Sequence, residues 1–369
     1  MTKPIRVLHI LQRMEAGGTQ ALLMNLYRNI DRSKVQFDFL VEYKEKQFYD
    51  DEIESLGGRI FRTSVREDFN VPGFISFLKK LFIEHPEYKI VHVHAFTIGY
   101  FCLRTAKKAG VPVRIAHSHN NETVHDGKYI LKRIMQRLYT VHANELFACS
   151  REAGKYLFND KEFNVLKNAI DSASFIADES VRKSVRKELS LGDELVVGSV
   201  GRLHPQKNQK FLLEVFRQVC EQRPDAILLL VGTGPLENEL KEETRRLGLQ
   251  ANVRFLGNRR DMPRLYQGLD VFAMTSLFEG LGIVAIESQA AGIPTVCSDG
   301  FPPDVEVSPL AVRMKLSDSA KEWAKAILKA AENPDRHKDM QSYIINAGFD
   351  VKESAEKLQS FYIDRYNAI

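Results

Sequence analysis

Two glutamates flank a glycine loop in the segment SLFEGLGIVAIESQAAG, residues 276–292. Glu279 stands before the glycines, and an apolar, alanine-rich stretch typical of a buried helix begins near Ile283. The first N–H groups of a helix have no partner inside it, so they and the positive end of its dipole attract anions. Glu287 lies one turn further along the same helix face, where a carboxylate can accept hydrogen bonds from a ribose or another sugar diol. The spacing therefore predicts a site for a sugar joined to an anion, and a chance pairing of two glutamates is the alternative.

Two basic residues follow an earlier strand-like run in the segment GSVGRLHPQKN. Arg202 can bind a diphosphate through two parallel (bidentate) hydrogen bonds, and Lys207 can bind it as a point charge. A solvated turn with incidental charges is the alternative. The segment VGTGP contains a Gly-x-Gly turn, which permits close approach of a ligand but is common in ordinary turns. The residues assigned to an anionic ligand by this reasoning are Arg202, Lys207, Gly232, Gly234, Gly280, Gly282 and Ile283.

Short β-rich runs alternate with helix-length amphipathic segments throughout the chain, and this alternation is typical of βαβ units with parallel sheets. The runs are residues 5–11, 37–43, 59–64, 90–96 and 114–120, and then, after a charged stretch at 178–194, residues 195–203, 226–235, 253–259, 269–276 and 294–300. We expect an α/β protein of two Rossmann-like domains whose parallel sheets face across a cleft. Ligands bind outside the carboxyl ends of such strands. The expected domains are residues 1–180 and 190–350, and a final helix at 351–369 is expected to pack back on the first.

The composition sets limits on the class of protein. The chain has 369 residues, 44% of them hydrophobic and 27% charged, and no apolar run reaches the ~20 residues of a membrane-spanning helix. The net charge of +4 is too small to indicate a nucleic-acid partner, and no nucleic-acid motif is present. The first residues have no cleavage site typical of a signal peptide, so we expect a cytoplasmic protein.

The order of the motifs GGTQALLMNL, AHSHN, GRLHPQKN, VGTGPL and the segment from FLGNRRDM to AAGIPTV resembles the retaining glycosyltransferases of family 4, which have the GT-B architecture. It is similar to bacterial enzymes that assemble capsular or exopolysaccharide chains. The resemblance implies that Arg202 and Lys207 bind the donor diphosphate, that Glu279 contacts the transferred sugar, and that Glu287 holds the nucleotide ribose. It also implies that the loop of Gly17 and Gly18 lies at the cleft beside the donor phosphates.

The same resemblance implies that His117 touches the sugar from the first domain, and we favour it over His119 by its position in the strand. The expected catalytic residues are Glu279, His117, Arg202 and Lys207. Further residues included in the donor site are Arg259, Leu281 and Val284. The segment FPPDVEVSP departs from the glycine-rich segment of many relatives, which leaves any role for Asp304 or Glu306 open.

The expected reaction is transfer of a hexose from a nucleoside diphosphate sugar, in the first place a UDP-sugar, to a polyprenyl-diphosphate-linked or saccharide acceptor with retention. No cofactor or metal is expected. The chain has no Asp-x-Asp, and His92 and His94 repeat the spacing of the AHSHN pair without a carboxylate partner. A UDP-sugar epimerase of the same fold and a non-catalytic nucleotide-binding partner subunit are the alternatives. A nicotinamide dehydrogenase is disfavoured because RMEAGGTQ lacks the Gly-x-Gly-x-x-Gly pattern.

A basic amphipathic stretch at residues 128–144 suggests how the first domain could reach a lipid-linked acceptor. Its cations are Lys128, Lys132, Arg133 and Arg137, and it contains no acidic residue. Such a helix could bind an anionic membrane surface, which would make the protein peripheral on the inner face of the cell membrane. An ordinary surface helix with a solvated basic face remains the alternative.

Overall fold

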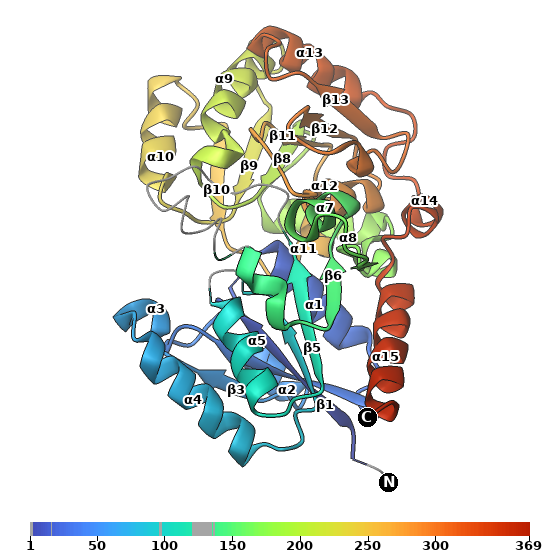
Figure 1. Cartoon of the computed structure of the whole chain (residues 1–369). Coiled ribbons are helices and arrows are strands. Elements are labelled where there is room, and N and C mark those ends of the chain that lie inside the picture. Colours follow the sequence, from blue (N-terminus) through green and yellow to red (C-terminus); the bar gives the residue numbers. More distant parts are fainter. Residues whose placement is uncertain (1–2, 16, 96–97, 120–134, 136) are drawn as a thin grey trace. The chain divides into compact units, whose positions relative to one another are not determined.

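The computed structural model describes residues 3–15, 17–95, 98–119, 135 and 137–369. The chain divides into two compact units (Figure 1). The first unit contains residues 1–169 and 351–369, and the second contains residues 170–350. The second unit begins at residue 170, inside the first domain expected at 1–180, because Phe175 is buried in its core and Ile170 bridges to Asp350. Within the described helices, none has both the length and the apolar composition needed to cross a membrane.

The first unit is built on a parallel sheet of seven strands in the order β3-β2-β1-β4-β5-β6-β7. The strands are β1 (Ile5–Leu11), β2 (Val35–Val41), β3 (Ile60–Arg62), β4 (Ile90–Val93), β5 (Val113–Ser118), β6 (Glu145–Ala148) and β7 (Asn164–Val165). The strand order reverses between β1 and β4, where His9 and His92 are register partners. Ligands of open α/β sheets bind at such a switch point.

Helices cover both faces of this sheet. The α-helices are α1 (Gly18–Asn29), α2 (Asp50–Ser55), α3 (Val65–Asp68), α4 (Val71–Glu84), α5 (Gly99–Lys108), α7 (Arg151–Phe158) and α15 (Val351–Asn367), and a 3-10 helix, η1, spans Thr140–His142. One buried cluster joins α1 and α15 to the face of β1 and β2 that carries Val7 and Phe37. A second cluster joins α4, α5 and α7 to the opposite face. The C-terminal helix α15 therefore belongs to the core of the first unit, although it follows the whole second unit in sequence.

The second unit has a parallel sheet of six strands in the order β10-β9-β8-β11-β12-β13. The strands are β8 (Val196–Val200), β9 (Ile227–Val231), β10 (Val253–Gly257), β11 (Val271–Met274), β12 (Thr295–Ser298) and β13 (Ala311–Met314). Its order reverses between β8 and β11. The loops that follow these two strands carry the two cations and Glu279, and Glu287 lies in the helix after the second loop. The expected site therefore lies at a topological switch point.

The helices of the second unit follow the same alternation. The α-helices are α8 (Glu179–Glu188), α9 (Gln209–Cys220), α10 (Glu237–Arg246), α11 (Met262–Gln267), α12 (Ile283–Ala290), α13 (Ala320–Ala331) and α14 (Gln341–Asn346). The 3-10 helices are η2 (Ser172–Phe175), η3 (Pro205–Lys207) and η4 (Pro303–Val305). Helices α9 and α13 cover one face and bury Trp323, and α11, α12 and α14 cover the other. The expected start of a helix at Ile283 is confirmed.

Candidate active site

The loop after β8 presents the two expected cations in different environments. Arg202 is exposed, and among the described residues its guanidinium has neither a hydrogen bond nor an ion pair. Lys207 ends η3, and its side chain crosses Gly201, where an added Cβ would lie 3.3 Å from Lys207 Cε. Lys207 is only 18% exposed. One cation is therefore free for an anionic ligand and the other is held against the backbone of its own loop.

Lys207 and Glu279 are direct partners. Lys207 Nζ lies 2.5 Å from Glu279 Oε1, and the Glu279 side chain is 8% exposed. The backbone of the Glu279 loop is fixed as well, because Glu279 N donates to Gly300 O at 2.9 Å and Leu277 N donates to Gln206 O at 2.8 Å. The sequence predicted that both side chains belong to one site, and the structure joins them by an ion pair.

The first turn of α12 lies at the end of this glycine loop. Gly282 caps the helix with φ of 81°, and no side chain caps the helix N–H groups. A Cβ at Gly282 would lie 2.2 Å from the ring of Phe301. A left-handed backbone and a close aromatic ring both favour glycine here. The N-terminus of α12 thus keeps N–H donors and a positive dipole end available for an anion.

Glu287 accepts a hydrogen bond from Tyr266, a residue that the sequence did not indicate. Tyr266 Oη lies 3.0 Å from Glu287 Oε2 and 3.2 Å from the carbonyl oxygen of Val284, and its hydroxyl is the donor in both contacts. Burial raises the pKa of the Glu287 carboxyl to about 7, and the hydrogen bond from Tyr266 opposes that rise. The carboxyl is therefore held in one orientation and is near its titration point at neutral pH.

The glycines after β9 serve the packing of loops. A Cβ at Gly232 would lie 2.2 Å from the carbonyl oxygen of Gly201, and a Cβ at Gly234 would lie 2.3 Å from that of Leu203. Both glycines thus let the turn after β9 pack on the backbone of the cation loop. Their expected contact with a donor stays a prediction. Arg259 pairs with Asp261 at 2.7 Å and with Glu188 at 3.0 Å, and these contacts raise its pKa.

The first unit contributes the other expected residues. Gly17 caps α1 with an extended backbone, no side chain caps the helix, and the space beside Gly18 is open. These features leave the first N–H groups of α1 available to a ligand. Because Gly17 and Gly18 belong to a different unit from Arg202 and Glu279, their role with the same donor stays a prediction.

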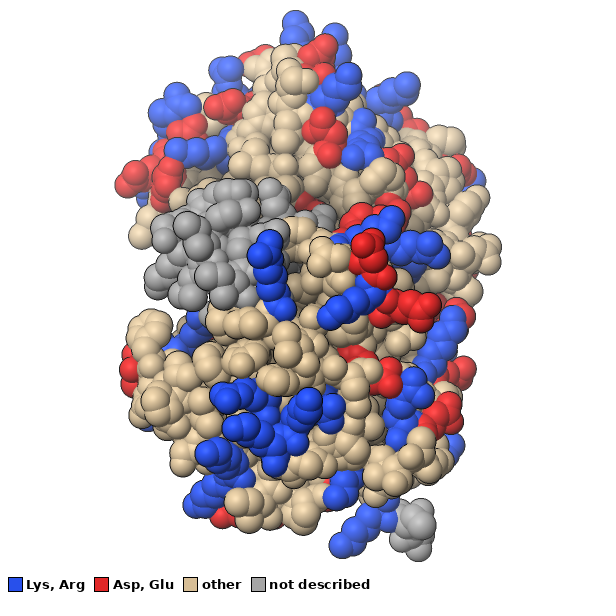
Figure 2. Space-filling view, in the orientation of Figure 1, with Lys and Arg blue, Asp and Glu red and all other residues tan. Residues whose placement is uncertain are grey.

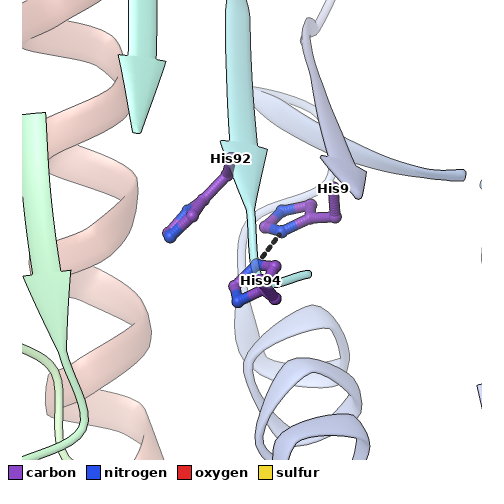
Figure 3. Close-up of side chains that lie close together, drawn as sticks. All are labelled: His9, His92 and His94. Carbon is purple, nitrogen blue, oxygen red and sulfur yellow. Dashed lines mark hydrogen bonds between the residues drawn. The ribbon is translucent and has the colours of Figure 1, made fainter. Parts of the chain in front are cut away.

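Five histidines gather where β1, β4 and β5 end, and we refer to them as the histidine cluster: His9, His92, His94, His117 and His119. Figure 3 shows three of them, with the hydrogen bond between His9 Nδ1 and His94 Nε2, which are 3.0 Å apart. His94 Nδ1 lies 2.8 Å from His119 Nε2, and His92 Nε2 lies 3.0 Å from His117 Nδ1. The sequence reading treated the histidines as two separate strand-end pairs, and the structure links them into one cluster with His9.

The cluster is held in a mostly apolar environment. Tyr362 of α15 lies 2.6 Å from His92 Nδ1 through its hydroxyl oxygen. Burial lowers the pKa of His9 and of His119 to about 3, and it lowers the pKa of His92, His94 and His117 well below the ordinary value. All five imidazoles are therefore neutral at pH 7.

Sequence reasoning missed three residues that shape these sites: His9, Tyr266 and Tyr362. His9 had a usable signal, because it is a titratable residue inside the otherwise apolar end of the strand VLHIL. The two tyrosines had none, since a tyrosine in an amphipathic helix is most often a core residue. Their roles depend on contacts with residues distant in sequence, 21 positions away for Tyr266 and 270 for Tyr362.

Comparison with known proteins supports the resemblance of this chain to glycosyltransferases. The family profile described as Glycosyltransferase Family 4 matches residues 16–173, and the profile described as Glycosyl transferases group 1 matches residues 180–347. EpsF of Bacillus subtilis (strain 168), which is named as a glycosyltransferase, is 35% identical over 369 residues, covering 97% of this chain and 96% of that protein. The UDP-Gal:alpha-D-GlcNAc-diphosphoundecaprenol alpha-1,3-galactosyltransferase of Escherichia coli is 26% identical and covers 98% of this chain and 97% of its own length.

The fold has solved counterparts. The crystal structure of Anabaena Alr3699/HepE in complex with UDP and glucose aligns with a TM-score of 0.80 at 20% identity, over 98% of this chain and all of the other. Together with the two parallel sheets, this likeness confirms the expected GT-B fold. Two family profiles that cover both units, and a relative 35% identical across nearly the whole chain, lead to one conclusion: this protein is a GT-B glycosyltransferase that belongs to glycosyltransferase family 4.

Proposed function

We propose that the protein transfers a hexose from a UDP-sugar, with retention at the anomeric carbon, to a polyprenyl-diphosphate-linked or saccharide acceptor in bacterial surface polysaccharide synthesis. The Escherichia coli relative is named for a UDP-linked donor and a diphosphoundecaprenol-linked acceptor, which supports a UDP-sugar and a lipid diphosphate acceptor for this chain. The observation that carries the proposal is the contact between Lys207 and Glu279 beside the uncapped start of α12. It brings a cation for a leaving phosphate and a carboxylate for a sugar into one small site.

The donor diphosphate is the first part of the mechanism. As the bond from the anomeric carbon to the diphosphate breaks, the sugar becomes oxocarbenium-like and negative charge grows on the departing phosphate. Arg202, Lys207 and the first N–H groups of α12 stabilise that charge. These groups act at the diphosphate in place of a metal ion, so we propose that transfer needs no divalent cation there.

The glutamates and one histidine hold the rest of the donor. The Glu287 carboxylate, oriented by Tyr266, accepts hydrogen bonds from the ribose. Glu279 contacts the transferred sugar, and Lys207 exchanges its bond to Glu279 for a phosphate oxygen when the donor binds. From the first unit, His117 contacts the sugar through Nε2, a buried atom without a partner among the described residues, and His119 is the alternative. Retention follows if the acceptor attacks on the leaving-group face and the departing phosphate takes its proton.

We also propose that the first unit attaches to an anionic membrane surface. Residues 128–134 and 136 of the basic stretch at 128–144, which include Lys128, Lys132 and Arg133, lie outside the described residues, although Arg137 is exposed. A second group of cations supports the idea. Arg104, Lys107 and Lys108 of α5 are exposed, and together with burial and Arg114 they lower the pKa of His142. Lys and Arg side chains gather over this part of the surface (Figure 2). Each such residue contributes about 1 kcal/mol toward an anionic membrane.

The test of the proposed reaction is an assay with a panel of UDP- and GDP-sugars, a polyprenyl diphosphate saccharide acceptor, and nuclear magnetic resonance of the linkage formed. We expect an α-linked product from one UDP-sugar, made at the same rate in EDTA and in Mg²⁺. Product formed from the donor alone, without acceptor, would instead identify an epimerase. Activity that is lost in EDTA and restored by Mg²⁺ or Mn²⁺ would contradict the metal-independent mechanism.

Vesicle co-sedimentation tests the attachment. We expect binding to vesicles that contain anionic lipid, weaker binding to neutral vesicles, and weaker binding of a variant with Arg104, Lys107 and Lys108 changed to Gln. A variant with Lys321, Lys325 and Lys329 of α13 changed to Gln removes the same charge from the other unit and serves as the control. Equal binding by both variants would contradict a docking surface on α5.

A further inference from the structure

The histidine cluster has three buried ring nitrogens without a partner, and the proposed transfer uses only one of them, Nε2 of His117. In the described part of the chain, Nε2 of His9, Nε2 of His117 and Nδ1 of His119 are buried without a hydrogen-bond partner. His9 is 0% exposed and His117 is 2% exposed. A buried polar atom without a partner is rare in folded proteins and calls for a ligand or another explanation.

The hydrogen bonds between the rings allow two of these nitrogens to carry free lone pairs. If Nε2 of His117 is unprotonated, its Nδ1–H donates to Nε2 of His92 at 3.0 Å, and Nδ1–H of His92 donates to Tyr362 Oη at 2.6 Å. If Nδ1 of His119 is unprotonated, its Nε2–H donates to Nδ1 of His94 at 2.8 Å. Each of these two rings then has one lone pair free, and His92 holds the other nitrogen of His117 in place. This is the arrangement found in histidine ligands of metal ions, whose second nitrogen donates to a neighbouring group.

We propose that His94, His117 and His119 bind one divalent transition metal ion, with Zn²⁺ as the best match. One nitrogen from each of the three rings lies within 4.8 Å of the others. A tetrahedral zinc site with Zn–N bonds of about 2.0 to 2.1 Å separates its nitrogens by about 3.4 Å. Side-chain shifts on the order of 1 Å therefore assemble the site, with the bond from His119 to His94 replaced by bonds to the ion.

Imidazole nitrogens select the class of ion. They suit Zn²⁺, Cu²⁺, Ni²⁺ and Co²⁺, whereas Mg²⁺ and Ca²⁺ require oxygen ligands. A site of three histidines also leaves a fourth position on the ion for water or another ligand.

A second trio, His9, His92 and His94, meets the same distance criterion. Two observations favour the first trio. His9 and His92 are 0% exposed, whereas His94 and His119 are partly exposed and so can be reached by an ion. The two deeper rings also hydrogen-bond to the proposed ligands, His9 to His94 and His92 to His117. They are therefore suited to orient the ligands from behind.

The ion would change the role of His117. Its Nε2 is the nitrogen that we propose for the sugar contact, so occupancy by the ion and that contact exclude each other. Zn²⁺ is then expected to slow transfer, with no part in binding the donor diphosphate. No metal was expected from the sequence. The strands β1, β4 and β5 bring their histidines together only in the folded sheet, so the spacing along the chain did not indicate this site.

The experiment measures metal binding directly. The full chain is purified without a polyhistidine tag, stripped with a chelator and titrated with Co²⁺, whose visible ligand-field absorption reports a four-coordinate site, and Zn²⁺ is then added to displace it. We expect one Co²⁺ per chain, displaced by one Zn²⁺. The His119→Gln variant changes a partly exposed side chain, and the His117→Asn/His119→Gln variant removes two ligands. We expect at least tenfold weaker binding in the first and no absorption band in the second.

The control is His85→Gln, which removes a histidine of the same unit whose Nδ1 pairs with Glu87 outside the cluster. It should bind Co²⁺ as the unchanged chain does. Circular dichroism at each step confirms that the variants are folded. The proposal is overturned if the unchanged chain gives no band or if the His119→Gln variant binds as tightly as His85→Gln. A loss of binding in His9→Gln but not in His119→Gln would assign the ion to the deeper trio and overturn it as well.

Discussion

In the proposed site of the second unit, different side chains contact the phosphates, the ribose and the transferred hexose. Lys207 and Glu279 neutralise each other at 2.5 Å, whereas Arg202 is exposed and unpaired among the described residues. A free UDP molecule carries the phosphates and the ribose but lacks the transferred hexose. Substitution of Glu279 should therefore affect transfer, whereas substitution of Glu287 should affect UDP binding.

Glu279→Gln should lower the transfer rate by tenfold or more while UDP affinity stays within about twofold. The contact that we propose for Glu279 is to the sugar, and a hydrogen bond to a charged group contributes roughly 1.5 to 3 kcal/mol. Removal of the carboxylate also frees Lys207 for phosphate, so UDP binding has no reason to weaken. Calorimetric titration with UDP and a steady-state transfer assay measure the two quantities. A variant with weak UDP binding and normal turnover would refute the assignment of Glu279 to the sugar.

Glu287→Gln should weaken UDP binding and stabilise the second unit at pH 8. The folded protein raises the pKa of this carboxyl from 4.5 to about 7, so its contribution to stability is present below pH 4.5 and is lost as the pH rises through 7. A neutral amide avoids that loss and can still accept from Tyr266. Each kcal/mol gained raises the melting temperature by about 2 to 4 °C. Thermal unfolding at pH 8 and pH 5 checks the sign, since the gain should shrink at pH 5.

Arg202→Ala should weaken UDP binding by about tenfold to a hundredfold without changing the melting temperature. The side chain is exposed and unpaired within the described residues, so its removal leaves no partner behind, yet a charge-assisted contact to phosphate is lost. Arg245→Ala, which removes an exposed arginine of α10, is the matched control and should bind UDP normally. Equal affinity of the two variants would show that the phosphate lies elsewhere.

At the scale of elements, the glycine before α12 fixes the position of the helix terminus. Gly282→Ala should destabilise the second unit and reduce UDP affinity, because the new Cβ would lie 2.2 Å from the ring of Phe301. Gly248→Ala is the control: its φ of 73° is similar to the 81° of Gly282, but no atom lies within 4 Å of its added Cβ. Alanine in a left-handed backbone costs roughly 1 to 2 kcal/mol.

Denaturant unfolding separates the two contributions. Gly248→Ala should show only the backbone cost and keep full UDP affinity. Gly282→Ala should lose more stability than that, together with part of its affinity. If the two variants were equally stable and bound UDP equally, Phe301 would have moved aside and the start of α12 would not depend on this contact.

The elements themselves were largely predictable where hydrophobic periodicity and turn residues agree. The bounds expected for β1, and the starts expected for α12 and α15, match the structure. The strands β6, β7 and β13 were missed; they have two to four residues and no completely buried run. The equally short β3 was expected, because it lies within a longer β-rich run at 59–64. Of the site, the residue types and their loops were predictable. The ion pair of Lys207 with Glu279 was not, because it depends on how the two loops pack.

The histidine cluster was unpredictable for a similar reason. Alternation along one strand placed His92 and His94 on one face, as it did His117 and His119. Only the parallel register of β1 with β4 brings His9 beside His92. The register of two strands depends on the whole sheet and on the helices packed on it, so no single segment of the sequence predicts it.

At the scale of the whole molecule, the two units should respond differently to acid. In metal-stripped protein, the first unit has five histidines whose folded pKa lies below the ordinary 6.5. The unfolded chain then binds more protons than the folded one below pH 6.5, so stability falls as the pH decreases. Each proton contributes a slope of about 1.4 kcal/mol per pH unit. In the second unit, the raised pKa of Glu287 increases the free energy of unfolding as the pH falls from 7 to 4.5. The lowered pKa of His337 decreases it over a similar range, so the two effects largely cancel.

The single tryptophan makes this prediction testable in one molecule. Trp323 is fully buried in the second unit, so its fluorescence follows the unfolding of that unit. Amide hydrogen exchange in β1 and β4, read by mass spectrometry, follows the first unit. Between pH 6.5 and 4.5 we expect exchange in β1 and β4 to accelerate, relative to its intrinsic rate, while the denaturant midpoint from Trp323 fluorescence stays nearly constant. A first unit that stays stable at pH 4.5 would mean that the five imidazoles are not held neutral by their surroundings. A parallel decline of both units would contradict their independent response to acid.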